Sequence, residues 1–148
     1  MTTATVEITS FGYLHGEEPE ARLKVDLRHH FRDPHVRPEL RYLTAHDRAV
    51  RDAVMATGGI RDLVAAAAAV VEAFLAGPRQ DEPVTLAVGC AGGRHRAASV
   101  AIFVFWIVSG DVEAAKEAGV EELAARFAER DLDVRLVHRD LDKDVVDR

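Results

Sequence analysis

The spacing of hydrophobic and polar positions changes several times along this chain, and each change marks a predicted element. Apolar and polar residues alternate over 6–13 (VEITSFGY) and again over 23–28 (LKVDLR), which predicts two strands. A nearly continuous, β-branched apolar run at 84–90 (VTLAVGC) predicts a central strand that is buried on both faces. The segment 132–141 (LDVRLVHRDL) predicts a last strand.

Helical periods occupy much of the chain between these strands. The pattern over 45–56 predicts a helix that stops at the glycines of TGG (57–59), and an alanine-rich helix is predicted over 60–77. The segment 96–108 is apolar almost all round, so its helix should be packed deep. The irregular stretch 29–44 predicts a loop of functional length.

A charged, amphipathic helix is predicted after the apolar one, over 109–131. Its N-cap candidates are Ser109 and Asp111, and Gly119 is a candidate break. Because strands alternate with helices, the fold class is α/β, with a mainly parallel central sheet flanked by helices. The loops that follow the strands are then expected to carry the chemistry.

Length and composition predict a single domain spanning residues 1–148. Apolar residues make up 48% of the chain and charged residues 30%, an ordinary globular composition. The longest apolar runs fall short of the ~20 residues that a membrane span needs. We recognise no N-terminal signal peptide, so the expected location is the cytoplasm.

Charge and cysteine content narrow the candidate chemistry. The formal net charge of -6 argues against a large basic face for nucleic acid. A single cysteine, Cys90, excludes an internal disulfide and a cysteine-rich zinc site. The adjacent His29 and His30 point opposite ways on an extended segment, and His15, His46 and His138 lack partners at ligand spacing. We therefore expect no metal and no cofactor.

The strand–loop–helix segment AVGCAGGRHRAAS (87–99) is the strongest candidate site. Two glycines let the backbone turn its N–H groups inward, and the following helix directs its positive end at the same point. Arg94, His95 and Arg96 add charge. The loop is thus predicted to bind an anion, whose identity the loop alone leaves open. The alternative is a glycine turn whose arginines face solvent.

The spacing from Cys90 to Arg96 also fits the C-(x)5-R pattern of cysteine-dependent phosphatases, in which a thiolate attacks a phosphate held by amides and an arginine. Two features argue against that enzyme. Ala97 stands where those phosphatases usually carry a hydroxyl, and Asp33 before Pro34 is a poor substitute for their general acid.

Five segments, in this order, resemble the C-terminal domain of RapZ, the RNase adapter protein. They are SFGY (10–13), VDLR (25–28), DPHVRPELRYLT (33–44), VGCAGGRHR (88–96) and VHRDLDK (137–143). The resemblance covers nearly the whole chain. The usual family member also has an N-terminal nucleotide-binding domain with a G-x-x-x-x-G-K-[ST] loop, which this chain lacks, so it looks like the C-terminal domain alone.

The resemblance implies a sensor rather than a catalyst, because this domain of RapZ binds glucosamine-6-phosphate. It implies a phosphate-binding loop, and it implies polar partners for the sugar at the end of the second strand and in the loop that follows. The loop residues are Cys90, Ala91, Gly92, Gly93, His95 and Arg96, and the polar partners are Asp26, Arg28 and His35. The alternatives are a surface ion pair for Asp26 and Arg28 and a turn residue for His35.

The resemblance also implies a contribution to binding a small regulatory RNA, but the basic C-terminus of the adapter members is replaced here by DKDVVDR. Ligand preference is also open, since Leu14, Ala91 and Ala97 depart from the family pattern. An RNA-binding adapter is the second hypothesis and would need a basic surface from Arg37, Arg41, Arg48 and Arg51. A phosphatase is the third. The apolar helix after the loop leaves room for a protein partner or self-association.

Overall fold

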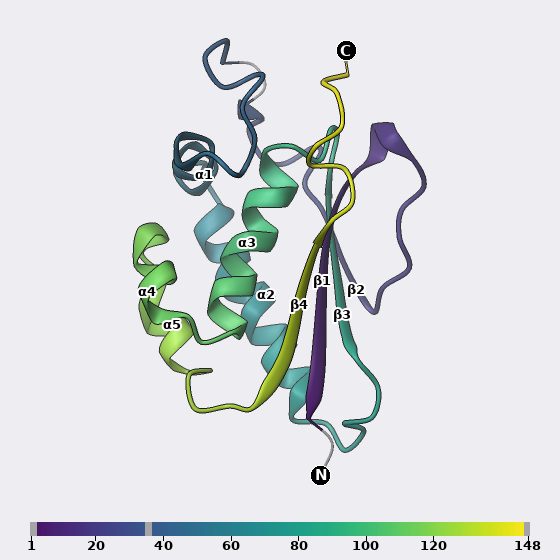
Figure 1. Ribbon diagram of the computed structural model, residues 1–148, viewed down its shortest axis with the longest axis vertical. Helices are drawn as coiled ribbons and strands as arrows, with labels where there is room; N and C mark the ends of the chain where they lie inside the picture. Colours follow the sequence, from purple (N-terminus) through teal and green to yellow (C-terminus); the bar gives the residue numbers. More distant parts are fainter. Residues whose placement is uncertain (1–2, 35–36, 147–148) are drawn as a thin grey trace.

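A four-stranded, all-parallel sheet organises the chain (Figure 1). The computed structural model describes residues 3–34 and 37–146. The strands are β1 (Ala4–Gly12), β2 (Leu23–Asp26), β3 (Val84–Cys90) and β4 (Leu132–His138), in the spatial order β2-β3-β1-β4. The predicted α/β class is thereby confirmed, and the predicted strand at 84–90 has the bounds of β3.

The helices lie together on one side of this sheet (Figure 1). They are α1 (Arg48–Met55), α2 (Ile60–Leu75), α3 (Arg96–Val108), α4 (Val112–Ala115) and α5 (Glu121–Ala125). Short 3-10 helices span Tyr13–His15 and Lys116–Ala118. A single helical layer follows from the connections, because right-handed crossovers from β2 to β3 and from β3 to β4 run in the same direction across the sheet.

The register assigns the side chains of the sheet to two different faces. Val6 and Ile8 of β1 pair with Val84 and Leu86 of β3, and all four are buried beneath the helices. The residues between them form a polar face on the other side of the sheet. That face includes Glu7, Lys24, Asp133 and Arg135, whose side chains are 43–60% exposed.

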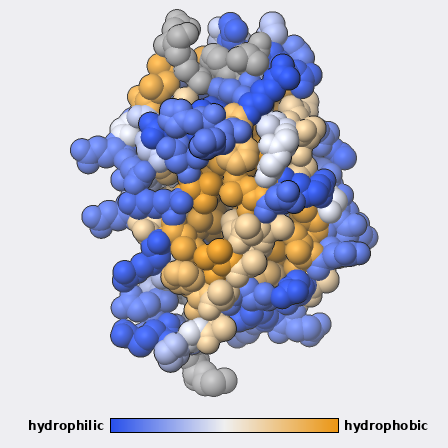
Figure 2. Space-filling model, turned by 180° about the vertical axis from the view of Figure 1, so that it is seen from behind, coloured by the Kyte–Doolittle hydropathy of each residue, from blue (hydrophilic) through white to orange (hydrophobic). Residues whose placement is uncertain are grey.

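The helix predicted to be packed deep, α3, is the centre of the core. It contacts β1, β3 and β4 as well as α1 and α2, and nearly all of its residues are buried. This burial leaves little apolar surface of α3 for self-association, since only Phe105 and Trp106 are partly exposed, and self-association stays a prediction. An apolar area is visible on the face shown in Figure 2, and the exposed apolar side chains of the described residues include Val70 and Phe74 of α2, which are 41% and 46% exposed.

The single helix predicted over 109–131 is interrupted. Asp111 is the N-cap of α4 and accepts a hydrogen bond from the amide of Ala114 at 3.1 Å. Gly119 adopts a left-handed conformation with φ +69°, which ends the 3-10 turn and separates it from α5. In the described part of the chain no single helix is long and apolar enough to cross a membrane, although α1 and α2, bent by 91°, satisfy the length and composition together.

Candidate functional site

The loop 91–95 lies at the carboxyl edge of the sheet, where the strands end side by side. Gly12 pairs with Cys90, and Asp26 pairs with Gly89, so the residues after β1, β2 and β3 converge there. In parallel α/β sheets, ligands bind in the crevice at this edge. The topology thus brings the loop 91–95 and the long loop after β2 to one place.

The loop packs against the end of β1 with no room for side chains at two glycines. A Cβ on Gly93 would lie 2.8 Å from the amide nitrogen of Gly12, and Gly93 has φ +79°. A Cβ on Gly12 would in turn lie 2.8 Å from the amide nitrogen of Gly93. The amide of Leu14 donates to the carbonyl of Ala91 at 3.0 Å. These contacts fix the backbone path of the loop.

Cys90 lies beneath the loop, with 3% of its surface exposed. Its sulfur accepts hydrogen bonds from the amides of Gly93 at 3.2 Å and Ala97 at 3.4 Å. The second of these amides belongs to the first turn of α3, where the N–H groups lack partners within the helix. The thiol is therefore the acceptor around which the loop is wound.

Arg96 is held from behind by the loop that follows β2. Its Nη1 donates to the carbonyls of Leu27 at 2.8 Å and Phe31 at 2.9 Å, and its Nη2 lies 3.2 Å from a carboxylate oxygen of Asp33. Its side chain is only 4% exposed. Among the described residues, its Nε has no hydrogen-bond partner although it is buried. A buried arginine is thus fixed in place with one donor free.

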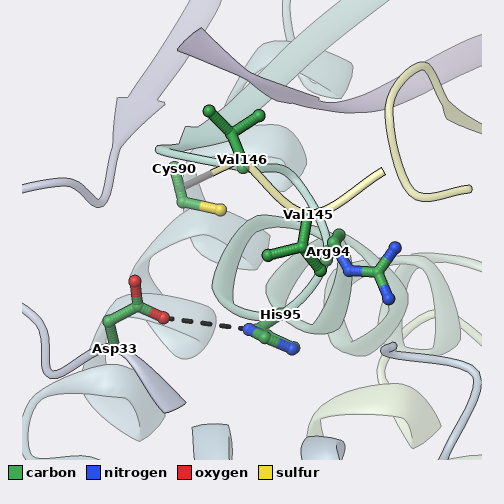
Figure 3. Close-up of a pocket in the computed structure, with 7 residues that line it drawn as sticks. Asp33, Cys90, Arg94, His95, Val145 and Val146 are labelled. Atoms are coloured by element: carbon green, nitrogen blue, oxygen red, sulfur yellow. Dashed lines mark ion pairs between the residues drawn. The ribbon is translucent and has the colours of Figure 1, made fainter. Parts of the chain in front are cut away.

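Arg94 and His95 were expected to add positive charge to the loop, but in the structure they form hydrogen bonds with backbone carbonyls of neighbouring segments. Arg94 donates to the carbonyls of Tyr42 at 2.8 Å and Lys143 at 2.7 Å, and its guanidinium points away from Cys90 (Figure 3). The Nε2 of His95 bonds the carbonyl of Leu43 at 2.9 Å, and its Nδ1 lies 3.8 Å from Asp33. Both side chains fasten neighbouring segments to the loop.

A small cavity lies over Cys90 (Figure 3). Its volume is about 10 Å³, close to the least that holds one water molecule. The residues that line it come from the loop after β2, the Cys90 loop and the last described residues of the chain: Asp33, Cys90, Gly92, Arg94, His95, Val145 and Val146.

Asp26 and Arg28 form an ion pair with each other at 2.7 Å, the alternative considered for them from sequence. The side-chain hydrogen bond from Arg28 is the main cause that lowers the pKa of Asp26. Arg28 also stacks over the ring of Tyr13 at 3.6 Å. Both side chains are more than a third exposed at the rim of the sheet, and His35 lies outside the described residues.

Two carboxylates that sequence analysis undervalued lie next to the loop. Asp33, discounted as a general acid, touches Arg96 and lines the cavity with Cys90. Asp140, which follows β4, is fully buried and accepts the amide of Gly12 at 2.7 Å. The only sequence signal for Asp140 was its place in the VHRDLDK segment.

Burial alone would raise the pKa of Asp140, but hydrogen bonds from Arg139, the Gly12 amide and Lys143 outweigh it and lower this pKa to about 2. Arg139 and Lys143 lie 2.8 Å and 2.6 Å from the carboxylate. The ionised carboxylate of Asp140 therefore connects the end of β1 to the segment after β4.

The arginines proposed for an RNA surface are largely paired with carboxylates. Arg51 forms a two-pronged pair with Glu117 at 2.7 Å and 2.8 Å, and Arg48 lies 3.5 Å from Asp52. Arg37 pairs with Glu39. Within the described ranges, no group of three or more His, Cys, Asp or Glu side chains is placed to hold a metal ion.

Fold and loop together define a small parallel α/β domain with a glycine-bearing Cys-(x)5-Arg loop between a central strand and a buried helix. The chain belongs to the RapZ C-terminal domain family, whose model matches residues 4–114. That match includes the Cys90 loop and ends before β4.

The similar curated proteins are named nucleotide-binding proteins. One from Thermobifida fusca (strain YX) is 38% identical over 101 residues, which are 67% of this chain and 34% of that protein. One from Bifidobacterium longum (strain DJO10A) is 38% identical over 101 residues, covering 67% and 30%. One from Clavibacter michiganensis is 37% identical over 97 residues, covering 64% and 33%. The chain thus spans about a third of the length of these relatives.

Proposed function

We propose that this chain is a non-catalytic sensor domain that binds a phosphorylated small molecule, of the glucosamine-6-phosphate type, at the loop Cys90–Arg96. The observation that carries the proposal is the buried guanidinium of Arg96, which is braced on two carbonyls and keeps an unpartnered Nε. Buried polar atoms in native proteins nearly always have partners, so an unpartnered donor here calls for an acceptor.

The backbone of the loop supports the same ligand chemistry. In the described part of the chain, the amides of Gly92 and Arg94 donate to no other residue, and both lie just before the N-terminus of α3. Amides at a helix N-terminus combine unpaired donors with a positive dipole end, which suits a phosphate group. The family model also matches the residues of this loop.

Calorimetric titration tests this proposal with glucosamine-6-phosphate, glucosamine and inorganic phosphate, each at two salt concentrations. Wild type should bind the sugar phosphate, bind phosphate more weakly and show no binding of glucosamine. Arg96→Lys keeps the charge but removes Nε, and it should weaken binding by about 10-fold or more because charge-assisted hydrogen bonds are lost.

Arg79→Ala is the matched control, since Arg79 forms an exposed ion pair with Asp81 far from the loop. Circular dichroism establishes that each variant is folded before titration. The absence of binding by folded wild type would contradict the proposed ligand class, and equal binding by wild type and Arg96→Lys would remove Arg96 from the site.

One observation favours a second candidate function, a cysteine phosphatase. Asp33 lines the same cavity as Cys90, where a general acid would be needed, and the sulfur of Cys90 accepts two amide hydrogen bonds. Against it, Asp33 is engaged with Arg96, and Ala97 supplies no hydroxyl. Hydrolysis of p-nitrophenyl phosphate by wild type, lost in Cys90→Ser, would establish this enzyme and displace the sensor.

A further inference from the structure

The last described residues of the chain lie over the candidate phosphate site. Val145 and Val146 line the cavity beside Cys90 and His95, and Val145 stands between these two side chains (Figure 3). With Val145 and Val146 in place the cavity measures only about 10 Å³. A phosphate group is much larger than the single water molecule that such a volume holds. The site is therefore closed by this segment.

The chain leading into the cover is firmly anchored. Leu141 is fully buried, in a small cluster with Ala98 and Ile102 of α3. Lys143 makes three contacts. Its Nζ lies 2.6 Å from the carboxylate of Asp140, its amide donates to the carbonyl of Asp140 at 3.1 Å, and its own carbonyl accepts a hydrogen bond from Arg94 at 2.7 Å. These contacts fix the chain as far as Lys143.

Beyond Lys143 the anchoring changes in kind. Within the described residues, Asp144, Val145 and Val146 form no hydrogen bond with the rest of the fold, and the two valines are half-buried. A short segment held by apolar contact alone opens more readily than the hydrogen-bonded core. Lys143 is the natural hinge.

The covering segment excludes an anionic ligand by its volume. A phosphate group at the loop would need the space that Val145 and Val146 occupy beside Cys90. The covered and the liganded site therefore exclude each other.

We propose that residues 144–146 form a lid that closes the Cys90 site and must move away for a phosphorylated ligand to bind. The proposal rests on the proposed function for its ligand, and it adds regulation of the same site. Because coupling between two binding events is reciprocal, any partner that holds the lid open raises the affinity of the loop for phosphate. Arg94 links the loop to the hinge, because it belongs to the loop and donates a hydrogen bond to the carbonyl of Lys143.

Cys90 is the only cysteine of the chain, so its alkylation by iodoacetamide, a small neutral reagent, reports access to the site whatever the ligand. We compare the full chain with Val145→Ser/Val146→Ser and with a chain that ends after Lys143. Both changes remove the apolar cover, and Cys90 should react about tenfold faster in each. Val137→Ser is the matched control, because Val137 is 54% exposed on the face of the sheet that points away from the helices.

Unchanged alkylation of Cys90 in both lid variants, with circular dichroism showing them folded, would overturn the lid. Equal acceleration in Val137→Ser would do the same, since the effect would then be general loosening. Acceleration confined to the two lid variants supports it.

Titration with inorganic phosphate and glucosamine-6-phosphate separates this inference from the proposed function. About tenfold tighter binding in the lid variants supports both. Faster alkylation with no binding by any variant supports the lid and overturns the phosphate site. Equal binding by all variants with unchanged alkylation supports the phosphate site and overturns the lid.

Discussion

Gly93→Ala tests whether the loop depends on its close approach to the end of β1. The added methyl group would lie 2.8 Å from the amide nitrogen of Gly12, 3.0 Å from the carbonyl carbon of Phe11 and 3.1 Å from the Cβ of Asp140. Two of these neighbours are backbone atoms of a central strand, so they cannot turn aside as a flexible side chain would. Gly93 also has φ +79°, a conformation that L side chains rarely adopt.

The magnitude follows from two costs that the same substitution imposes. A left-handed conformation costs a residue with a Cβ about 1–2 kcal/mol. Forcing an extra methyl group into a packed region costs about 1–3 kcal/mol. Together the free energy of unfolding should fall by about 2–5 kcal/mol, a large part of the ~5–15 kcal/mol typical of a domain.

Urea unfolding followed by circular dichroism measures this effect. With a slope of about 2 kcal/mol per molar urea, the midpoint of Gly93→Ala should fall by about 1–2.5 M. Gly58→Ala is the matched control, because a Cβ there meets nothing within 4 Å. It should be neutral or stabilising by up to about 1 kcal/mol. If the two variants unfolded within about 0.5 kcal/mol of each other, the loop would not be fixed by its contact with Gly12.

Two further predictions concern charged side chains. Because the pKa of Asp140 is lowered to about 2, its ionisation stabilises the fold above pH ~4, and this stabilisation is lost as the pH falls towards 2. Between pH 5 and pH 2, wild type should lose about 2 kcal/mol more unfolding free energy than Asp140→Asn, and parallel urea-derived profiles would contradict the assignment. Glu117→Gln should lower the free energy of unfolding in urea by about 1–3 kcal/mol, because its ion pair with Arg51 is largely buried. Asp81→Asn, in an exposed ion pair, should lower it by under ~0.5 kcal/mol, and equal losses in the two variants would refute the contrast.

The secondary structure was predictable where one local signal dominated. The apolar run of β3 and the apolar helix α3 have the bounds that the sequence predicts, Val84–Cys90 and Arg96–Val108. The helix predicted from residue 45 begins at Arg48, because the amide of Thr44 donates to the Asp47 carboxylate and forms a turn first. Local hydrogen bonds by such residues compete with helix formation.

The location of the candidate site was predictable, but its contacts were not. Glycines and arginines between a strand and a helix marked the loop 91–95. Arg96 donates to the backbone carbonyls of Leu27 and Phe31. Because every residue has a backbone carbonyl, such acceptors cannot be identified from the sequence. Whether Asp26 and Arg28 meet a ligand stays a prediction, since in this structure they pair with each other.

The open face of the sheet explains why adjacent central strands carry different patterns. Parallel sheets are usually covered on both faces, yet here one helical layer covers one face. Strand β1 therefore alternates, with Ile8 buried and Glu7 towards the polar face. Strand β3 is apolar apart from Thr85 for a different reason, because the rings of Phe11 and Tyr13 cover Gly89 so closely that any Cβ there would overlap them. The apolar residues of β3 are thus explained by neighbouring side chains that cover the strand at the carboxyl edge, beside the loop. A second layer of helices is not the reason.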